Sequence, residues 1–531
     1  MGQLTVSLGT IPTVSLLHRI MTDSIIRFYH QLDFRQMMDS ILALLAYNPD
    51  EPMLFSSGLF LFLFLGFTFV YMLLQHQRTL RLMFVTAFSY YFYYKSSGLY
   101  FGLLALVTLS DFLIARAIWN IRQAHPGRGS QLKALMVLSL VVDLGLLAYF
   151  KYTNFFVGMW DEIVGRNFQP YDIFLPVGIS FFTFQSMSYT IDVYRGQLKP
   201  LPSLLDYAFY VSFFPQLVAG PIVRARDFAP QIRRPLVVTD DMFARGVYFI
   251  VIGLFKKAVI SDYISLNFVD RIFDNPTLYS GMENLLGVYG YALQIYCDFS
   301  GYSDMAIGIA LLLGFHFPIN FNAPYRSVSI TDFWRRWHIS LSTWIRDYIY
   351  ISLGGNRKGK ARTYVNLIIT MLLGGLWHGA SLNFVFWGGL HGVALALHKW
   401  MREKVFHHDR HYVSAGWRKW GAVVLTFHFV CLAWVFFRNV SFADSWLMLS
   451  RVFTDFHAEL LPQVVSSYRY VFMLMLLGYV THYLPDGWQE TLIRTLRRCN
   501  VVVDALLLAA VIYLVIQTKS STIQPFIYFQ F

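Results

Sequence analysis

Two histidines stand in apolar segments that are rich in tryptophan. His378 lies in MLLGGLWHGA (371–380), and His338 lies in DFWRRWHISLSTWIRDYIY (332–350). Removal from water disfavours the charged imidazolium, so a histidine at the end of an apolar run tends to be neutral. A neutral imidazole can accept a proton from a hydroxyl group. The pattern therefore indicates either a general base at His378 or a histidine with a purely structural role.

Other side chains around His338 bear on binding. Trp334, His338 and Ser342 follow at i, i+4 spacing, which predicts that they share one face of a helix. Arg335 and Arg336 stand shortly before His338, and their planar guanidinium groups suit anionic groups such as phosphate. We therefore expect Trp334 and Ser342 to line a cavity and the two arginines to contact an anionic group.

Three more charged residues have two interpretations each. Arg224 follows GPIV in FFPQLVAGPIVRARDF (213–228), where it either meets donor phosphates or simply marks the cytoplasmic side. Asp298 and Asp304 interrupt the apolar segment QIYCDFSGYSDMAIG (294–308). Carboxylates are costly at membrane depth and are usually paired or functional. We expect capping or pairing with arginine rather than catalysis, with both side chains as candidates to line a cavity.

Two further aromatic ring side chains lie near the WHG element. Trp377 directly precedes His378, and His391 lies thirteen residues beyond it in WGGLHG. Both are candidates to line the same cavity as His378, and a structural role is the alternative for His391. The three cysteines are scattered singly, without metal-ligand spacing, so we expect neither a metal site nor a bound cofactor.

These residues belong to a chain whose composition indicates a membrane protein. Of its 531 residues, 56% are hydrophobic and 14% are charged, whereas a soluble domain has about 25% charged residues. The segment 54–74 carries no charge and is long enough to cross a hydrocarbon core, which takes about 20 residues. Lipid offers backbone groups no hydrogen-bond partners, so such segments must be helical. The sequence predicts an all-α polytopic protein with about eleven transmembrane helices, together with re-entrant and amphipathic helices.

Basic residues gather in short loops between the apolar segments. The net charge of +12 is therefore read as a positive-inside signal and as an attraction for anionic membrane lipid or an anionic cytoplasmic substrate, and nucleic-acid binding is excluded. We expect these loops to face the cytoplasm. Their clusters are Arg78 and Arg81; Arg116, Arg122, Arg128 and Lys133; Arg224, Arg226, Arg233 and Arg234; Arg357, Lys358, Lys360 and Arg362; and Arg494, Arg497 and Arg498.

The chain divides into three parts. Residues 1–50 carry apolar side chains at roughly helical spacing, which predicts an amphipathic helix on the membrane surface; a leader without fixed structure is the alternative. Residues 51–517 form the helical body. Residues 518–531 form an aromatic tail that ends in PFIYFQF.

The order and density of these motifs resemble the membrane-bound O-acyltransferase family, specifically its bacterial branch that contains the alginate O-acetylation protein. The motifs are LPVGISFFTFQSMSYTIDVYRG (175–196), 213–228, 294–308, SITDFWRRWHISLSTWIRDYIYISLGGNRKG (329–359) and 371–380, and the resemblance spans roughly residues 54–440. It implies a helical body around a tunnel, with the donor entering from the cytoplasm and the acceptor from the other side. It also implies that His378 and His338 are the catalytic residues. With a donor implied, Arg335, Arg336 and Arg224 are the candidates for binding it.

The tail adds a second resemblance. Its pattern Phe526-x-Tyr528-x-x-Phe531 resembles the C-terminal tail of a small partner in the related machinery for D-alanylation of lipoteichoic acid. That resemblance implies that the hydroxyl of Tyr528 accepts the acyl group and relays it. An aromatic anchor at the membrane interface is the alternative.

The leading hypothesis from the sequence is a multi-pass O-acetyltransferase of the bacterial inner membrane. It would take acetyl from cytoplasmic acetyl-CoA and pass it across the membrane to O-acetylate an exopolysaccharide such as alginate or cellulose. The expected partner is a periplasmic polysaccharide acetyltransferase of the SGNH type or similar. Two alternatives stay open: D-alanyl transfer from a carrier-protein thioester, and transport of a polymer or acyl donor.

Overall fold

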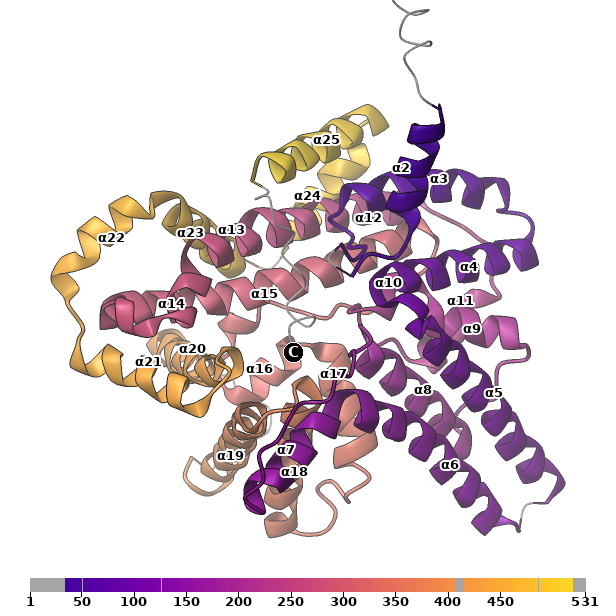
Figure 1. The fold of residues 1–531 in the computed structure, drawn as a ribbon, viewed down its shortest axis with the longest axis horizontal. Helices are drawn as coiled ribbons and strands as arrows, with labels where there is room; N and C mark the ends of the chain where they lie inside the picture. The colour runs from indigo at the N-terminus through magenta and orange to yellow at the C-terminus, as the bar shows by residue number, and fades with distance from the viewer. Residues whose placement is uncertain (1–33, 50, 126, 407–414, 486, 519–531) are drawn as a thin grey trace, which may run out of the picture.

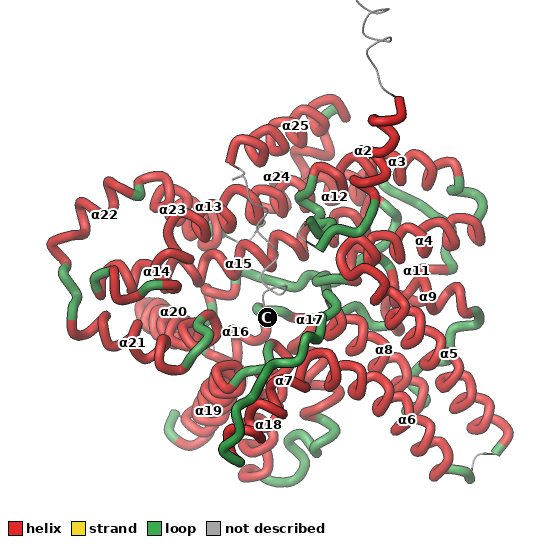
Figure 2. The backbone as a smooth tube through the Cα atoms, viewed as in Figure 1, coloured by secondary structure: helices red, strands yellow, loops and turns green. Residues whose placement is uncertain are grey.

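The computed structural model describes residues 34–49, 51–125, 127–406, 415–485 and 487–518. Every regular element in these residues is a helix, as Figure 1 and Figure 2 show. The predicted all-α class is confirmed for this part of the chain. The tail 519–531, and Tyr528 with it, lies outside the described residues, as do residues 1–33.

The helices vary widely in length, and several are interrupted. The α-helices are α2 (Phe34–Leu45), α3 (Gly58–Leu73), α4 (Arg78–Ser97), α5 (Phe101–Ala124), α6 (Gly129–Leu147), α7 (Thr153–Ile163), α8 (Ile179–Tyr194), α9 (Leu204–Ser212), α10 (Phe214–Leu217), α11 (Ala225–Ile232), α12 (Asp240–Leu254), α13 (Asp262–Ile264), α14 (Asp270–Asp274), α15 (Gly281–Leu312), α16 (Ile330–Arg336), α17 (Ile339–Trp344), α18 (Lys360–His378), α19 (Leu382–Lys404), α20 (Gly416–Arg438), α21 (Phe442–Thr454), α22 (Leu461–Ser467), α23 (Arg469–Tyr483), α24 (Trp488–Arg498) and α25 (Val501–Thr518). Wider π-helical turns occupy Ala148–Tyr152, Phe255–Ser261, Ser265–Val269 and Ile345–Tyr350. Tighter 3₁₀ turns occupy Gly98–Tyr100, Pro276–Leu278, Pro324–Arg326 and Ala458–Leu460.

Membrane-length apolar helices are fewer than the sequence predicts. By length and composition, the described residues contain three such stretches: Arg78–Ala124, Gly129–Ile163 and Gly416–Arg438. A fourth is added if the pair Ala458–Ser467 and Arg469–Tyr483, bent by 95°, is one span. The 47 residues of the first stretch would extend about 70 Å, which is long enough for two crossings. Many of the remaining helices are shorter than a crossing or carry polar residues.

The helix α15 forms the centre of the bundle (Figure 1). It begins with a capping box, in which Ser280 and Glu283 satisfy each other's backbone N–H groups. Its glycines admit α12 at close range: a Cβ added to Gly301 would lie 2.8 Å from the carbonyl oxygen of Gly253. Contact this close without side chains is typical of helix pairs in membranes.

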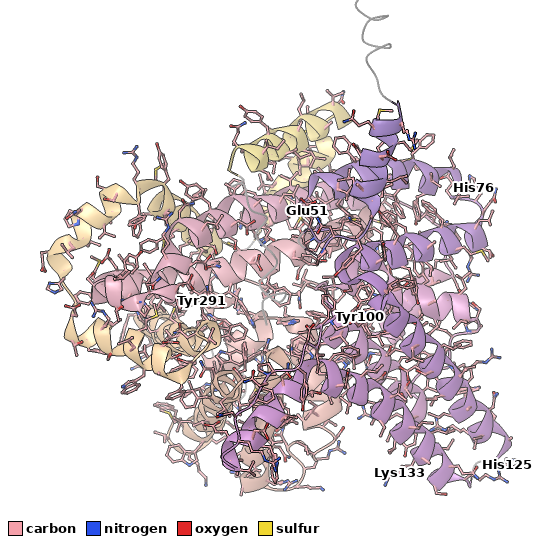
Figure 3. The ribbon with its side chains drawn as sticks, in the orientation of Figure 1. Glu51, His76, Tyr100, His125, Lys133 and Tyr291 are labelled. Carbon is pink, nitrogen blue, oxygen red and sulfur yellow. The ribbon has the colours of Figure 1, made fainter. Side chains whose placement is uncertain are left out.

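The long helices α5 and α6 pack together on one flank. Figure 3 shows that α5 begins beside Tyr100 near the middle of the molecule and ends beside His125, close to Lys133 of α6. Between them, the hydroxyl of Ser139 donates to the buried carboxylate of Asp111 at 2.6 Å.

Two of the basic clusters meet in space. Arg78, at the start of α4, and Arg233, just after α11, both pair with Asp206, at 2.9 and 3.2 Å. Arg122, in the last turn of α5, donates to the carbonyl oxygen of Val193 at 2.8 Å. The clusters of Arg78 and Arg233, which the sequence assigns to one side of the membrane, are therefore adjacent.

The described part of the predicted N-terminal amphipathic segment is helical. The helix α2 covers Phe34–Leu45 and leaves apolar side chains exposed, among them Met38 and Leu42. Its location on the membrane surface stays a prediction.

Candidate active site

His378 ends α18, and the glycines around it bring α18 and α19 together. A Cβ added to Gly375 would lie 2.2 Å from the carbonyl oxygen of Phe384. A Cβ added to Gly388, on the other helix, would lie 2.3 Å from the carbonyl oxygen of Met371. The glycines thus permit a close approach of the two helices, which fixes the end of α18 against the start of α19.

Aromatic rings enclose the imidazole of His378, whose residue is only 2% exposed. The centroids of the Trp377 and Trp387 rings lie 5.0 Å from the imidazole centroid, and that of Phe437 lies at 5.3 Å. An enclosure of this kind favours the neutral imidazole, because a charged ring would lose its hydration. The state that a general base requires is therefore the favoured one.

Two side chains from the π-helical turn Ala148–Tyr152 hold the end of α18. The ammonium group of Lys151 donates to the carbonyl oxygens of Trp377 and His378, at 2.8 and 2.9 Å. The hydroxyl of Tyr152 donates to the preceding carbonyl oxygen, that of Leu376, at 2.7 Å. The last carbonyls of a helix have no partners within the helix. Lys151 and Tyr152 supply them, and they hold the backbone of His378 in place.

His338 lies at a break between two helices, so one prediction is wrong. The helix α16 ends at Arg336 and α17 begins at Ile339. His338 adopts a left-handed conformation between them, with φ of 43°. Trp334, His338 and Ser342 therefore do not share one face of a single helix.

Asn320 determines the tautomer of the buried His338 ring. The side-chain oxygen of Asn320 accepts hydrogen bonds from the backbone N–H and the hydroxyl of Ser340, at 3.1 and 2.9 Å. The same oxygen lies 3.2 Å from Nδ1 of His338. Because this oxygen can only accept, Nδ1 carries the proton. Nε2 then bears a lone pair, and it has no hydrogen-bond partner among the described residues.

Trp377 lies between the two histidines. Its ring centroid is 6.0 Å from that of His338 and 5.0 Å from that of His378. Trp377 and Lys151 also line a cavity of about 70 Å³. Two histidines that are forty residues apart in the sequence therefore meet around one tryptophan.

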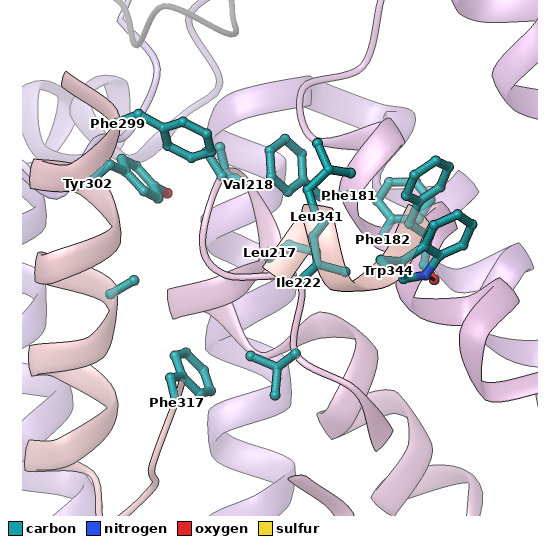
Figure 4. Packing of buried hydrophobic residues seen from close by; sticks show 14 of the residues in the cluster. Phe181, Phe182, Leu217, Val218, Ile222, Phe299, Tyr302, Phe317, Leu341 and Trp344 are labelled. Atoms are coloured by element: carbon teal, nitrogen blue, oxygen red, sulfur yellow. Dashed lines mark hydrogen bonds between the residues drawn. The ribbon is translucent and has the colours of Figure 1, made fainter. Parts of the chain in front are cut away.

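Aromatic side chains of α8 and α17 pack together next to Trp377. The ring of Phe184 in α8 stacks on Trp344 at 3.8 Å and lies 5.5 Å from Trp377. Figure 4 shows Trp344 and Leu341 of α17 close to Phe181 and Phe182 of α8. The segment that follows His338 is thereby packed against α8.

Trp334 and His391 pair with each other behind His378. The indole N–H of Trp334 donates to Nδ1 of His391 at 3.3 Å, which places the proton of His391 on Nε2. The imidazole of His391 also lies 4.7 Å from the ring of Trp387, which contacts His378. Trp334 and His391 are both buried. Ser342 is half-buried and donates to the carbonyl oxygen of Trp337.

Asp298 and Asp304 form ion pairs with lysines rather than with the expected arginines. Asp304 accepts from Lys256 at 2.7 Å, and Asp298 pairs with Lys257. Lys257 also pairs with Asp262 at 2.8 Å. Asp304 and Lys256 both line a cavity of about 360 Å³. The pairing explains how these carboxylates are tolerated among apolar helices.

Arg224 belongs to an arginine cluster that we define as Arg195, Arg224, Arg226 and Arg346. Arg224 is 94% buried, and its Nη1 donates to Asp347 at 2.7 Å. Its Nη2 has no partner among the described residues. Burial alone would raise the pKa of Asp347, but Arg346 and Arg224 together hold that pKa below its usual range.

Tyr348 connects the arginine cluster to the histidines. The guanidinium groups of Arg195 and Arg224 lie 5.3 and 5.2 Å from its ring centroid. The ring of Tyr348 lies 5.0 Å from that of Trp344, which stacks on Phe184. The row of rings continues to Trp377, beside His378.

Arg335 and Arg336 lie elsewhere. Both line a groove between α16, α19 and α20, where Arg336 pairs with Asp332 at 3.1 Å. The three predicted donor contacts are thus divided between two regions, Arg224 in one and Arg335 and Arg336 in the other.

Sequence reasoning missed Lys151, Tyr152 and Asn320. Lys151 and Tyr152 act on carbonyls more than 220 residues away in the chain, so no local motif could have found them. The lysine did leave one signal, since it interrupts an otherwise apolar stretch. Charged residues within membrane segments are rare and usually functional.

Comparison with known proteins agrees with this geometry. Residues 194–443 match the model of the membrane-bound O-acyltransferase family, and this range contains His338, His378 and the arginine cluster. A probable alginate O-acetylase of Pseudomonas aeruginosa is 42% identical over 413 residues, which are 76% of this chain and 75% of that protein.

Two other relatives carry different names. A peptidoglycan O-acetyltransferase of Helicobacter pylori is 39% identical over 376 residues, 66% of this chain and 69% of that protein. A teichoic acid D-alanyltransferase of Bacillus subtilis is 30% identical over 284 residues, 51% of this chain and 71% of that protein. The chain therefore belongs to the membrane-bound O-acyltransferase family of enzymes.

Proposed function

We propose that the protein takes acetyl from acetyl-CoA and passes it across the bacterial inner membrane for O-acetylation of an alginate-like exopolysaccharide. The observation that carries the proposal is the pair of buried histidines on either side of Trp377. Relatives that are named as O-acetylases of alginate and of peptidoglycan support acetyl as the group and an envelope or extracellular polymer as its destination.

The chemistry starts with the neutral imidazole of His378. It takes the proton from an acceptor hydroxyl while the oxygen attacks the thioester carbonyl carbon. The tetrahedral intermediate then expels the thiolate of CoA, which receives the proton from the imidazolium. An oxygen ester and a free thiol result, and no covalent histidine intermediate is needed.

His338 has a role that its tautomer defines. Because Nδ1–H faces Asn320, only the lone pair of Nε2 is directed elsewhere. A lone pair accepts a hydrogen bond from a hydroxyl but cannot stabilise an oxyanion. We infer that His338 orients the acceptor hydroxyl rather than stabilises the tetrahedral intermediate.

The donor approaches by way of the arginine cluster. The unpartnered Nη2 of Arg224 and the neighbouring Arg195, Arg226 and Arg346 offer guanidinium groups to the phosphates of CoA. The row of rings from Tyr348 to Trp377 leads from there to His378. This geometry favours Arg224 as the donor contact over Arg335 and Arg336, which line the other groove.

The remaining features concern passage across the membrane. We infer a body of about eleven crossing segments around a tunnel, with the basic end in the cytoplasm. The acyl group then reaches the hydroxyl of Tyr528, which relays it to a periplasmic acetyltransferase of the SGNH type or similar. The aromatic FxYxxF tail supports this relay.

A second candidate is D-alanyl transfer from a carrier-protein thioester, favoured by the relative from Bacillus subtilis. That relative shares less of the chain than the alginate O-acetylase does. Family membership favours catalysis over transport of a polymer or donor. Cellulose as the acceptor finds no support in the relatives reported above.

One labelling experiment separates these activities. Purified protein is incubated with acetyl-CoA, a D-alanyl carrier protein or a longer acyl-CoA, each labelled in the acyl group. We expect consumption of acetyl-CoA, and the His378→Ala protein serves as the inactive control. Consumption of the D-alanyl thioester in place of acetyl-CoA would establish the second candidate.

A further inference from the structure

A large cavity lies away from His338 and His378. It is a groove of about 1590 Å³ between α16, α19 and α20, and Arg326 and Pro485 also line it. Sites for small ligands usually have about 300–1,000 Å³. This groove therefore offers more room than a compact metabolite fills.

Positive charge gathers at one end of the groove. Arg335 comes from α16, Arg402 from the last turn of α19, and Arg418 and Lys419 from the first turn of α20. Among the described residues, no carboxylate lies within ion-pair distance of these four side chains. The Nε of Arg402 is buried and also lacks a partner there. Within the described part of the chain, the groove thus has four cations without an ion-pair partner, beside the Arg336–Asp332 pair.

The rest of the groove is apolar. On α20 its wall extends from Trp420 to Phe429, and on α19 from Leu390 to Met401. At 1.5 Å per residue these walls are about 14 and 16 Å long, or half of a hydrocarbon core of about 30 Å. Leu425 is 74% exposed at the open side. The apolar part therefore matches the depth of one membrane leaflet.

A wall of rings separates the groove from His378. Trp334 and His391 are joined by a hydrogen bond, and Trp387 lies between His391 and His378. Both His391 and Trp387 are fully buried. The rings of Trp334, His391 and Trp387 thus lie between the groove and His378.

We propose that the groove between α16, α19 and α20 binds an anionic phospholipid. The phosphate headgroup lies against Arg335, Arg402, Arg418 and Lys419, and the acyl chains lie along the apolar walls of α19 and α20. Charge complementarity with an anionic headgroup is the basis for this choice, because basic pockets between membrane helices bind such lipids. The inference does not depend on the proposed function.

The test uses a photo-crosslinkable phosphatidylglycerol and its phosphatidylcholine counterpart, each added to full-length protein in nanodiscs. Mass spectrometry should locate phosphatidylglycerol on peptides that contain residues 390–402 and 418–429, with little phosphatidylcholine there. The triple variant Arg402→Gln/Arg418→Gln/Lys419→Gln should lower this labelling about tenfold or more, since each cation near a headgroup contributes about 1 kcal/mol.

A matched control removes three exposed cations from the loop before α18 and from the first turn of α18, in Arg357→Gln/Lys358→Gln/Arg362→Gln. This control should keep wild-type labelling of the groove. Equal loss in both triple variants would contradict the site and indicate general attraction to charge. Equal labelling of wild type by both lipids would also overturn it. A raised KM for acetyl-CoA in the groove variant, without change in lipid labelling, would assign the groove to the donor instead.

Discussion

The two histidines are held by different kinds of contact. The backbone of His378 is held by hydrogen bonds from Lys151 to its carbonyl group and that of Trp377, whereas the side chain of His338 is held by Asn320. The first arrangement fixes where a ring is attached, and the second fixes which nitrogen carries a proton. A general base such as His378 needs a fixed position, and an orienting residue such as His338 needs a fixed tautomer.

Removal of the His378 ring should end transfer. A general base contributes roughly 10²–10⁴-fold to the rate, so His378→Ala should lower kcat for acetyl transfer by that factor while the protein still inserts and elutes as one species. Hydrolysis and transfer of labelled acetyl-CoA are the measurements. A turnover close to that of wild type would contradict the assignment.

Lys151 should act on catalysis through the backbone of His378. In Lys151→Met, two buried carbonyl groups lose their donor, and the end of α18 becomes free to shift. We expect kcat to fall about tenfold with little change in KM for acetyl-CoA, because Lys151 acts on the backbone carbonyl groups of Trp377 and His378. Steady-state kinetics measure both constants.

The control for Lys151 lies on the same helical stretch. Lys133 is exposed in α6, and Lys133→Met removes the same charge without touching α18. It should retain wild-type kcat. If Lys151→Arg, which keeps the donors, also fails to recover activity, the ammonium group would have a role other than holding the carbonyls.

At the scale of elements, the sequence predicted the packing of helices better than it predicted where a helix is interrupted. The glycines near His378 correctly indicated close helix packing, because a missing side chain has a direct steric consequence. The break at Trp337 and His338 was missed, because the left-handed residue is a histidine, and neither Gly nor Pro stands there to indicate it. The backbone strain of a positive φ in such a residue is offset by its surroundings, here by the hydrogen bond between His338 and Asn320.

The α18–α19 contact gives a paired prediction. Gly388→Ala places a methyl group 2.3 Å from the carbonyl oxygen of Met371, so α19 must move away from α18. We expect a loss of about 1–3 kcal/mol in stability, seen as a lower Tm, and a fall in transfer activity. The neighbouring Gly389→Ala meets only Leu372 Cδ2, at 3.4 Å. It should leave both quantities unchanged, and equal effects in the two variants would contradict this account.

At the scale of the whole molecule, the basic residues predicted which segments are neighbours more accurately than hydropathy predicted the number of membrane-length helices. Hydropathy predicted about eleven spans, whereas three or four described helices have membrane length and composition. Shorter and interrupted helices escape a length criterion because they can be buried by their neighbours instead of by lipid. Two of the basic clusters, in contrast, do lie together, as the shared partner Asp206 of Arg78 and Arg233 shows.

The side of the membrane that the basic loops face can be measured. In a background without reactive cysteines, Arg128→Cys and Arg357→Cys should react with an impermeant maleimide only after the cells are opened, since short basic loops stay in the cytoplasm. Gln169→Cys, exposed in the loop after α7, should react in intact cells. Labelling of Arg128→Cys or Arg357→Cys from outside would reverse the direction of transfer.

The relay through Tyr528 depends on that direction. A phenol has a pKa of about 10 and is protonated in neutral water, so it needs a base to attack a thioester. His378 supplies that base if the apolar tail enters the site, and burial of its aromatic side chains favours such entry over exposure to water. Attack forms a tyrosyl ester and releases the thiol, and the ester remains reactive enough to pass on its acyl group.

Tyr528→Phe keeps the ring and removes only the attacking oxygen. It should stop acetylation of the polymer without lowering the amount of folded protein, and wild type given acetyl-CoA alone should carry a hydroxylamine-labile acetyl group on its C-terminal peptide. If Tyr528→Phe decorates the polymer normally, the acceptor hydroxyl belongs to another protein.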